Sequence, residues 1–178
     1  ALYACGWQEG RVQVAGIPAG WQVGAPLALR GPLGRGFSLP ASAARVALAA
    51  LSAHPARLRL LMQAALARGA SVAFYADAVP PGLPDEVEVL PLNLLPEAPA
   101  WADYLAVEMD GAQARAWRRW FNLRFDQLLA CPAEALVGVP MPCGEAAGCG
   151  LCAVETHSGW KLACKDGPVF ALASLAVD

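Results

Sequence analysis

Charged residues are scarce in this chain of 178 residues: Asp, Glu, Lys and Arg together make up 16%, and the formal net charge is −2. Only 13 residues are Lys or Arg, whereas nucleic-acid-binding domains carry a basic excess, so a nucleic-acid partner is not expected. Hydrophobic residues make up 57%, which excludes a chain that is disordered over its whole length. The 15 prolines and 17 glycines predict many turns but follow no collagen-like period.

Long apolar runs are missing as well. Every apolar stretch is broken by Pro, Gly or a charged residue well before the about 20 residues that a membrane-spanning helix needs. The first residue is Ala1 and not Met, and no secretory signal is visible near it. We therefore expect a cytoplasmic protein that makes no membrane contact.

Six cysteines are the most informative residues that the chain does contain. Two of them are scattered, and the other four follow one another with the spacing C-x5-C-x2-C-x11-C, at positions 143, 149, 152 and 164. Disulfides suit small secreted chains that are short of core, but this chain is rich in Ala, Leu and Val and can bury a core without them. A metal or cluster site is therefore the preferred interpretation.

The spacing favours an iron–sulfur cluster over zinc. Structural zinc sites commonly use two C-x2-C knuckles, and this chain has one such pair, Cys149 and Cys152. The run is close to the plant-type [2Fe–2S] spacing, C-x4-C-x2-C…C, with one extra residue in the first gap. We predict that Cys143, Cys149, Cys152 and Cys164 bind a [2Fe–2S] cluster, and a structural zinc site stays open as the alternative.

Glycines within the cysteine loop fit the same interpretation. Three thiolates must converge from one loop, so the backbone has to wrap around the bound group, and glycine allows positive φ and close approach. Gly144, Gly148 and Gly150 are therefore predicted to line the cluster, with amide N–H groups free to point at its sulfurs. Cys164 can arrive from a strand because Gly159 turns the chain back.

The rest of the chain predicts alternating strands and helices. Apolar or alternating runs predict strands at 11–15, 26–30, 45–51, 71–76, 87–90, 103–108 and 135–139. Apolar positions spaced i, i+3, i+4 and i+7 predict a helix over 55–68, with Pro55 in its first turn and Gly69 as its cap. A second helix is predicted over 111–130. A strand, a helix and a strand between 45 and 76 form the unit of a parallel sheet.

These patterns together predict an α/β fold. We expect a parallel-sheet layer of the nucleotide-domain kind, with a short N-terminal β segment and a C-terminal [2Fe–2S] cysteine module. The expected divisions are 1–37 for the β segment and junction, 38–139 for the α/β domain and 140–178 for the cluster module.

Two stretches of the chain resemble one known family. M-P-C-G-E-A-A-G-C-G-L-C-A-V, with the later G-W-K-L-A-C-K-D-G-P-V-F, resembles the C-terminal iron–sulfur domain of the electron-transfer subunit of type B dihydroorotate dehydrogenase. L-A-L-R-G-P-L-G-R-G-F at 27–37 is similar to that family's junction between flavin barrel and nucleotide domain. The α/β middle is similar to the nucleotide half of the ferredoxin reductase superfamily, so the resemblance covers most of the chain.

The resemblance implies a function and a set of partners. The family's cluster cysteines correspond to Cys143, Cys149, Cys152 and Cys164, and the family implies FAD, pyrimidine biosynthesis and a flavoprotein catalytic subunit in an oligomer. We expect an oxidoreductase component that relays electrons between that dihydroorotate dehydrogenase-like partner and a second acceptor. No Ser/His/Asp set, paired carboxylates or P-loop is present, so we expect a conduit and not a self-sufficient catalyst. The alternative is a divergent reductase-fold scaffold with a structural zinc site held by the four cysteines.

Two departures from the family pattern bear on the cofactors. Only 30 residues precede Gly31, enough for two or three strands and not for a six-stranded barrel, so 1–37 is expected to be a remnant of the flavin barrel, or the rest of the barrel lies outside this sequence. After its first strand the nucleotide domain of the family has a glycine-rich turn that lets the backbone approach a pyrophosphate. This chain has S-A-H-P at 52–55 instead. Tight binding of NAD(P) is therefore not expected.

Overall fold

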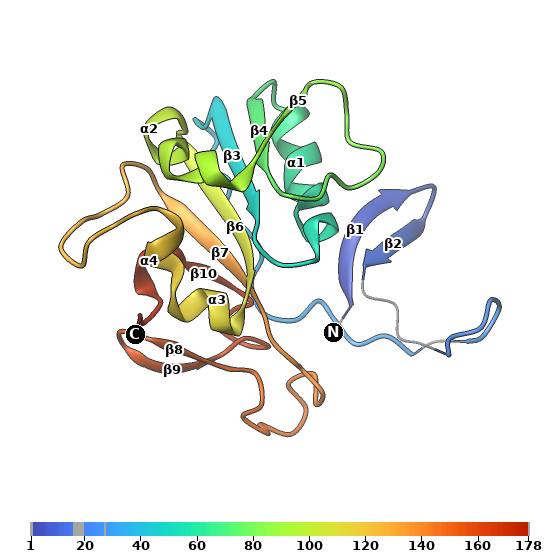
Figure 1. Ribbon diagram of the computed structural model, residues 1–178. Coiled ribbons are helices and arrows are strands. Elements are labelled where there is room, and N and C mark those ends of the chain that lie inside the picture. The colour runs from blue at the N-terminus through green and yellow to red at the C-terminus, as the bar shows by residue number, and fades with distance from the viewer. Residues whose placement is uncertain (1, 16–19, 27, 178) are drawn as a thin grey trace.

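A six-stranded sheet forms the centre of the structure, a computed structural model that describes residues 2–15, 20–26 and 28–177 (Figure 1). The strand order is β10-β7-β6-β3-β4-β5, and all neighbours run parallel except β10, which pairs antiparallel with β7. The strands are β3 (Arg45–Ala50), β4 (Ser71–Tyr75), β5 (Val87–Leu90), β6 (Tyr104–Asp110), β7 (Ala133–Gly138) and β10 (Val169–Ala171). The predicted α/β fold with a mostly parallel sheet is confirmed.

The helix predicted over 55–68 crosses between β3 and β4. Pro55 begins a 3-10 turn, η1 (Pro55–Leu58), because its fixed φ suits the first helical turn. The chain then continues as α1 (Arg59–Leu66). The buried side chains of η1 and α1 follow the predicted helical spacing and pack against Val46 and Leu48 of β3. One face of the sheet is thereby covered.

The opposite face of the sheet is covered by short helices and by the C-terminal module. These helices are η2 (Leu92–Glu97), α2 (Ala98–Trp101), α3 (Gly111–Arg115), α4 (Trp117–Trp120) and η3 (Leu172–Ser174). Ala47 and Ala49 of β3 share a single apolar core with Trp117 and with Val154 of the module. Among the helices that the structure describes, none is long and apolar enough to span a bilayer.

The single helix predicted over 111–130 is wrong. The helical backbone breaks at Ala116 (φ −113°, ψ 18°), so α3 and α4 are separate, and an irregular loop follows α4. The guanidinium of Arg118 explains the loop, because its Nη1 donates to two loop carbonyls at 2.9 and 2.7 Å. Phe125 and Leu128 lie in this loop with 84% and 78% of their surface exposed.

The N-terminal segment forms a separate two-stranded hairpin, β1 (Tyr3–Gln8) with β2 (Arg11–Ala15). The prediction of β2 is confirmed, whereas β1 was not predicted. The strand predicted at 26–30 does not form among its described residues, and residue 27 lies outside them. β1 packs against η1 and α1, so this hairpin contacts the two helices that cover one face of the sheet (Figure 1).

Asp103 ties the starts of β3 and β6 together, and this contact predicts a pH dependence of stability. Its carboxylate accepts hydrogen bonds from the Arg45 guanidinium at 2.8 Å and from the amides of Arg45 and Ala44 at 2.9 and 3.1 Å. These bonds, led by that of the guanidinium, hold the pKa of Asp103 below its ordinary 3.8. Because the folded-state pKa is lowered, the stabilisation is present above about pH 4 and is lost as the pH falls through the folded-state pKa.

We therefore expect Asp103→Asn to be less stable than the unmodified protein at pH 7, with a smaller difference in stability near pH 2. Urea unfolding of both proteins at the two pH values measures the difference in the free energy of unfolding. Asp85→Asn, which changes an exposed carboxylate, serves as the control. An equal difference at both pH values would contradict the assignment.

Candidate metal centre

The four clustered cysteines lie where the chain leaves the carboxyl end of β7. Cys143 and Cys149 belong to the turn-rich loop that follows β7, and Cys152 directly precedes a hairpin of β8 (Ala153–Thr156) and β9 (Gly159–Leu162). The hairpin brings Cys164 back beside Cys152, and the amide of Ala163 donates to the carbonyl of Cys152 at 2.9 Å. Cys164 lies in the turn directly after β9, so the chain reaches it from a strand that begins at Gly159.

The sulfur atoms meet as two pairs. Sγ of Cys143 lies 3.4 Å from Sγ of Cys149, and Sγ of Cys152 lies 3.3 Å from Sγ of Cys164. These distances are far longer than the about 2.05 Å of a disulfide bond. Two thiolates at ~2.3 Å from one tetrahedral metal ion lie roughly 3.7 Å apart. Each pair is therefore spaced to share one metal ion after a small adjustment.

The two pairs do not merge into a single ready-made site. Within the described residues, no three Cys, His, Asp or Glu side chains gather closely enough to hold one metal ion. A site that needs all four thiolates around one zinc ion would require a larger rearrangement than a site with two metal ions. Thiolates are the ligands that iron–sulfur clusters select, so the donor set fits an iron–sulfur cluster.

The two pairs differ in burial. The side chains of Cys152 and Cys164 are each 2% exposed and belong to the apolar core beneath the sheet. Cys149 is exposed and Cys143 is half-buried. A group held between the pairs would have one end in the protein interior and the other end facing solvent.

The thiols of the two pairs also differ in acidity. The amide N–H groups of Cys149 and Ala147 lower the pKa of Cys143 to about 6, because hydrogen bonds favour a thiolate. The hydrogen-bonded thiol of Cys152, together with burial, raises the pKa of Cys164 to about 11. Metal binding to Cys164 must therefore displace its proton, whereas Cys143 already favours the thiolate form.

The glycines predicted beside the cluster all have left-handed backbone conformations. Gly144, Gly148 and Gly150 have φ of 49°, 57° and 75°, which bend the loop between the cysteines. A Cβ atom at Gly148 or Gly150 would meet nothing within 4 Å. At these two positions the backbone angle favours glycine, and the space around them does not decide the residue.

Asp166 makes a specific contact in the turn that carries Cys164. Its carboxylate accepts a hydrogen bond from the amide of Leu162 at 3.0 Å, and its own amide donates to the Leu162 carbonyl at 2.7 Å. Both bonds close the turn that carries Cys164. An Asp two residues after a cysteine and before Gly167 is a turn signal that could have indicated this role.

A buried ion pair lies at the carboxyl ends of β3 and β6. Glu108 is 0% exposed, accepts a hydrogen bond from the Ser52 hydroxyl at 2.7 Å, and pairs with Nη1 of Arg57 at 2.8 Å. The Arg57 guanidinium also lies 4.2 Å from the centre of the Tyr3 ring in β1. This network was not predicted from the sequence, although a Glu within the apolar run of β6 was a signal of it.

This network stands where dinucleotides bind in related folds. In open α/β sheets the ligand site lies beyond the carboxyl ends of the strands at which the strand order reverses, which here are β3 and β6. The buried carboxylate is paired with Arg57, and Pro55 supplies no N–H donor at the start of η1. That this chain does not bind NAD(P) tightly stays a prediction.

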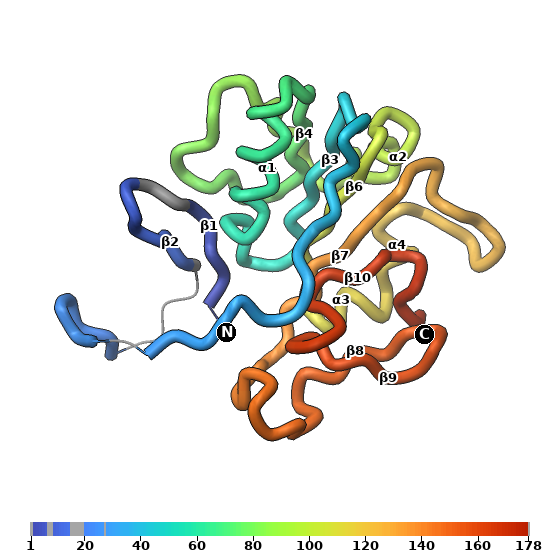
Figure 2. The backbone as a smooth tube through the Cα atoms, turned by 180° about the vertical axis from the view of Figure 1, so that it is seen from behind, coloured from blue at the N-terminus to red at the C-terminus, as the bar shows by residue number. Residues whose placement is uncertain are grey.

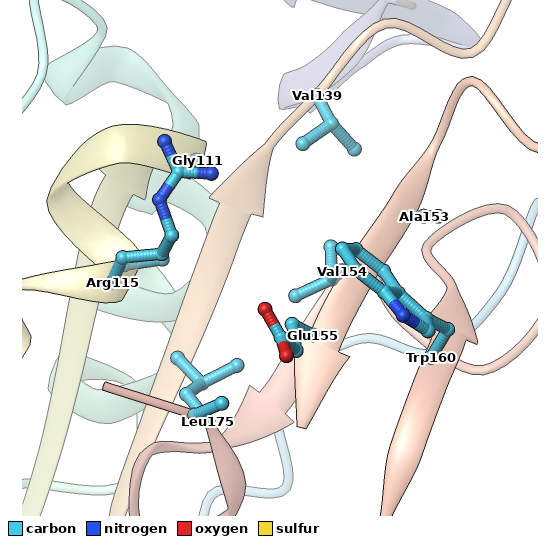
Figure 3. A pocket seen from close by; sticks show the side chains of 10 residues that line it. Gly111, Arg115, Val139, Ala153, Val154, Glu155, Trp160 and Leu175 are labelled. Atoms are coloured by element: carbon cyan, nitrogen blue, oxygen red, sulfur yellow. The ribbon is translucent and has the colours of Figure 1, made fainter. Parts of the chain in front are cut away.

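A small cavity lies between α3 and the β8–β9 hairpin (Figure 3). Arg115 reaches toward it from the α3 side, and Glu155 and Trp160 line it from the hairpin side. Its volume of about 130 Å³ is below the roughly 300–1,000 Å³ of sites for drug-sized ligands. This cavity is too small for a flavin or a dinucleotide.

Comparisons with known proteins agree with the geometry. Residues 140–176 match the family model described as the iron–sulfur cluster binding domain of dihydroorotate dehydrogenase B. A solved structure of an NADH-dependent reduced ferredoxin–NADP oxidoreductase, described as giving insights into flavin-based electron bifurcation, has the same fold with a TM-score of 0.72. Its identity is 17%, over 98% of this chain and 72% of that chain, so it shows the fold alone. No curated protein matches the chain. The predicted resemblance of the cysteine-bearing C-terminal segment is confirmed, and the fold of the chain is similar to that of this oxidoreductase.

Proposed function

We propose that this chain, with an iron–sulfur binding domain of the dihydroorotate dehydrogenase B type on a ferredoxin reductase-like fold, is an electron-transfer subunit. It relays single electrons between a flavoprotein dehydrogenase, of the dihydroorotate dehydrogenase kind, and a second acceptor. The observation that supports this most is the arrangement of four cysteine sulfurs as two pairs, with Sγ–Sγ distances of 3.4 and 3.3 Å.

A [2Fe–2S] cluster is the group that we propose for these residues. Cys143 and Cys149 would hold one iron and Cys152 and Cys164 the other, and the bound cluster supplies one-electron transfer. The protein keeps the buried pair, Cys152 and Cys164, away from water and the other pair, Cys143 and Cys149, near the surface. A low-dielectric inner end and an exposed outer end suit electron exchange with a docked protein, because the transfer does not require the donor to enter a pocket.

The source of electrons is a protein partner in this proposal and not a pyridine nucleotide bound to this chain. The buried Ser52–Glu108–Arg57 network supports this, because it fills the region of the sheet that would hold the pyrophosphate. FAD stays an expectation from the family: among the described residues before 31, the paired strands are β1 and β2. A cytoplasmic location and an oligomeric assembly with the flavoprotein also stay predictions.

Chemical analysis of protein purified without oxygen tests the proposed function. We expect two iron and two acid-labile sulfide per chain, visible absorbance that bleaches with dithionite, and an EPR signal from the reduced cluster. A colourless protein with one zinc per chain would contradict the proposal and favour the alternative, a reductase-fold scaffold whose four clustered cysteines hold a structural zinc ion.

A further inference from the structure

The junction loop, residues 31–37, packs directly on the segment that carries Cys164. The amide of Arg35 donates to the carbonyl of Gly167, and the amide of Val169 donates back to the carbonyl of Arg35 at 3.4 Å. Arg35 and Pro168 form an isolated parallel bridge. Figure 2 shows the junction segment running beside the last part of the chain near β10 before it enters β3. Two segments far apart in the sequence thus form one short ladder.

Gly34 makes this close contact possible. Its φ is +66°, a conformation that residues with a side chain adopt at a cost. A Cβ atom at Gly34 would overlap the carbonyl oxygen of Gly167 and would lie 2.8 Å from the carbonyl oxygen of Ala163. Both obstacles are backbone atoms, so they cannot move aside as the end of a flexible side chain can. Any side chain at Gly34 must therefore push the two segments apart.

The junction loop touches the neighbours of one cysteine from each sulfur pair. Ala163 and Gly167, which meet Gly34, belong to the turn around Cys164. On the other side of the loop, Cδ1 of Leu33 lies 3.6 Å from the Cβ position of Gly144, the residue after Cys143. The loop therefore bridges the turn after β9 and the cysteine loop after β7.

We propose that the junction loop is a clamp that sets the position of Cys164 relative to the cysteine loop, with Gly34 as the positioning residue for the cluster. Cys164 needs such a clamp because it is the proposed ligand furthest along the chain from the other three. Contacts from surrounding residues to the metal ligands orient those ligands, and loss of such contacts typically weakens metal binding by about 10- to 100-fold. The inference rests on the proposed cluster function.

The test is Gly34→Ala, with Gly36→Ala as its matched control in the same loop. A Cβ atom at Gly36 meets nothing within 4 Å, and its φ lies outside the left-handed region. In the metal-free protein, hydrogen exchange followed by mass spectrometry should show amides of 163–169 exchanging at least about 10-fold faster in Gly34→Ala only. Exchange in β3 and β4 should match that of the unmodified protein.

The loaded protein gives a second readout. Gly34→Ala should retain less than about half of the iron at a fixed chelator concentration, and its remaining clusters should have a shifted reduction potential and EPR spectrum. Gly36→Ala should retain the iron, potential and spectrum of the unmodified protein. Equal exchange and equal spectra in the two variants would overturn the clamp.

A third variant keeps the test decisive if Gly34→Ala does not fold. Leu33→Ala removes the contact with the cysteine loop and leaves the backbone ladder, so the EPR spectrum should shift while 163–169 keeps its slow exchange. An unchanged spectrum in Leu33→Ala would contradict the bridge. If the unmodified protein binds no iron, the proposed function fails, and the exchange of the metal-free variants still decides whether the clamp exists.

Discussion

Cys149→Ser is expected to lose the cluster, with iron and acid-labile sulfide per chain falling at least about tenfold. A serine hydroxyl is a poor ligand for a centre selected by soft thiolates, and the pair that Cys143 forms with Cys149 would be left with one sulfur. Because Cys149 is exposed, the change removes no apolar packing from the core. The visible circular dichroism and the iron content should collapse, while the far-ultraviolet spectrum of the metal-free protein stays as it was.

The matched control for this experiment is Cys131→Ser. Cys131 is a half-buried free cysteine outside the clustered four. Its replacement should leave iron, sulfide and the EPR signal unchanged, which separates a ligand effect from a general effect of losing a thiol. Full iron and sulfide in Cys149→Ser would show that this residue is not a ligand.

Glu108→Gln is expected to lower the free energy of unfolding by about 3 kcal/mol, because breaking a buried ion pair on one side leaves an uncompensated charge. The value is at the lower end of the usual range because Arg57 keeps 12% of its side chain exposed and keeps its contact with the Tyr3 ring. Urea unfolding measures the loss. Glu86→Gln, at an exposed position near β5, should change the free energy by less than about 0.5 kcal/mol.

A double replacement separates the charge from the packing in this network. Replacing both Glu108 and Arg57 by Leu removes the two buried charges together, and well-packed apolar replacements of a buried pair are often neutral or stabilising. The double variant should therefore be more stable than Glu108→Gln. If Glu108→Gln were as stable as the unmodified protein, the ion pair would contribute nothing to the stability of the fold.

The parallel sheet was predictable because its strands are short apolar runs bounded by turn residues. The predicted strand at 87–90 has the observed bounds, and the helix predicted from Pro55 onward begins there. The stretch 111–130 was not predictable in the same way. Its spacing is helical, but the Arg118 guanidinium binds the carbonyls of Arg124 and Gln127 in the next loop. These side-chain to backbone hydrogen bonds compete with the helical hydrogen bonds of that stretch.

In the candidate site too, the features set by local sequence were predictable and those set by distant contacts were not. The grouping of four cysteines was predictable because their spacing is local, but their pairing depends on how the β8–β9 hairpin returns Cys164 to Cys152. The Glu108 network and the Gly34 contact join residues more than 50 positions apart, and neither has a periodic pattern that would indicate it. The division of the chain at 37 and 139 stays a prediction.

The apolar core that the sheet shares with the C-terminal part of the chain has a consequence for evolution and for engineering. Val154, Leu172 and Leu175 of the C-terminal part pack in one cluster with Leu105 and Val107 of β6. Each part therefore covers apolar surface that the other would expose on its own. We therefore expect the C-terminal cysteine segment to fold in a fusion protein only when the sheet against which it packs is included.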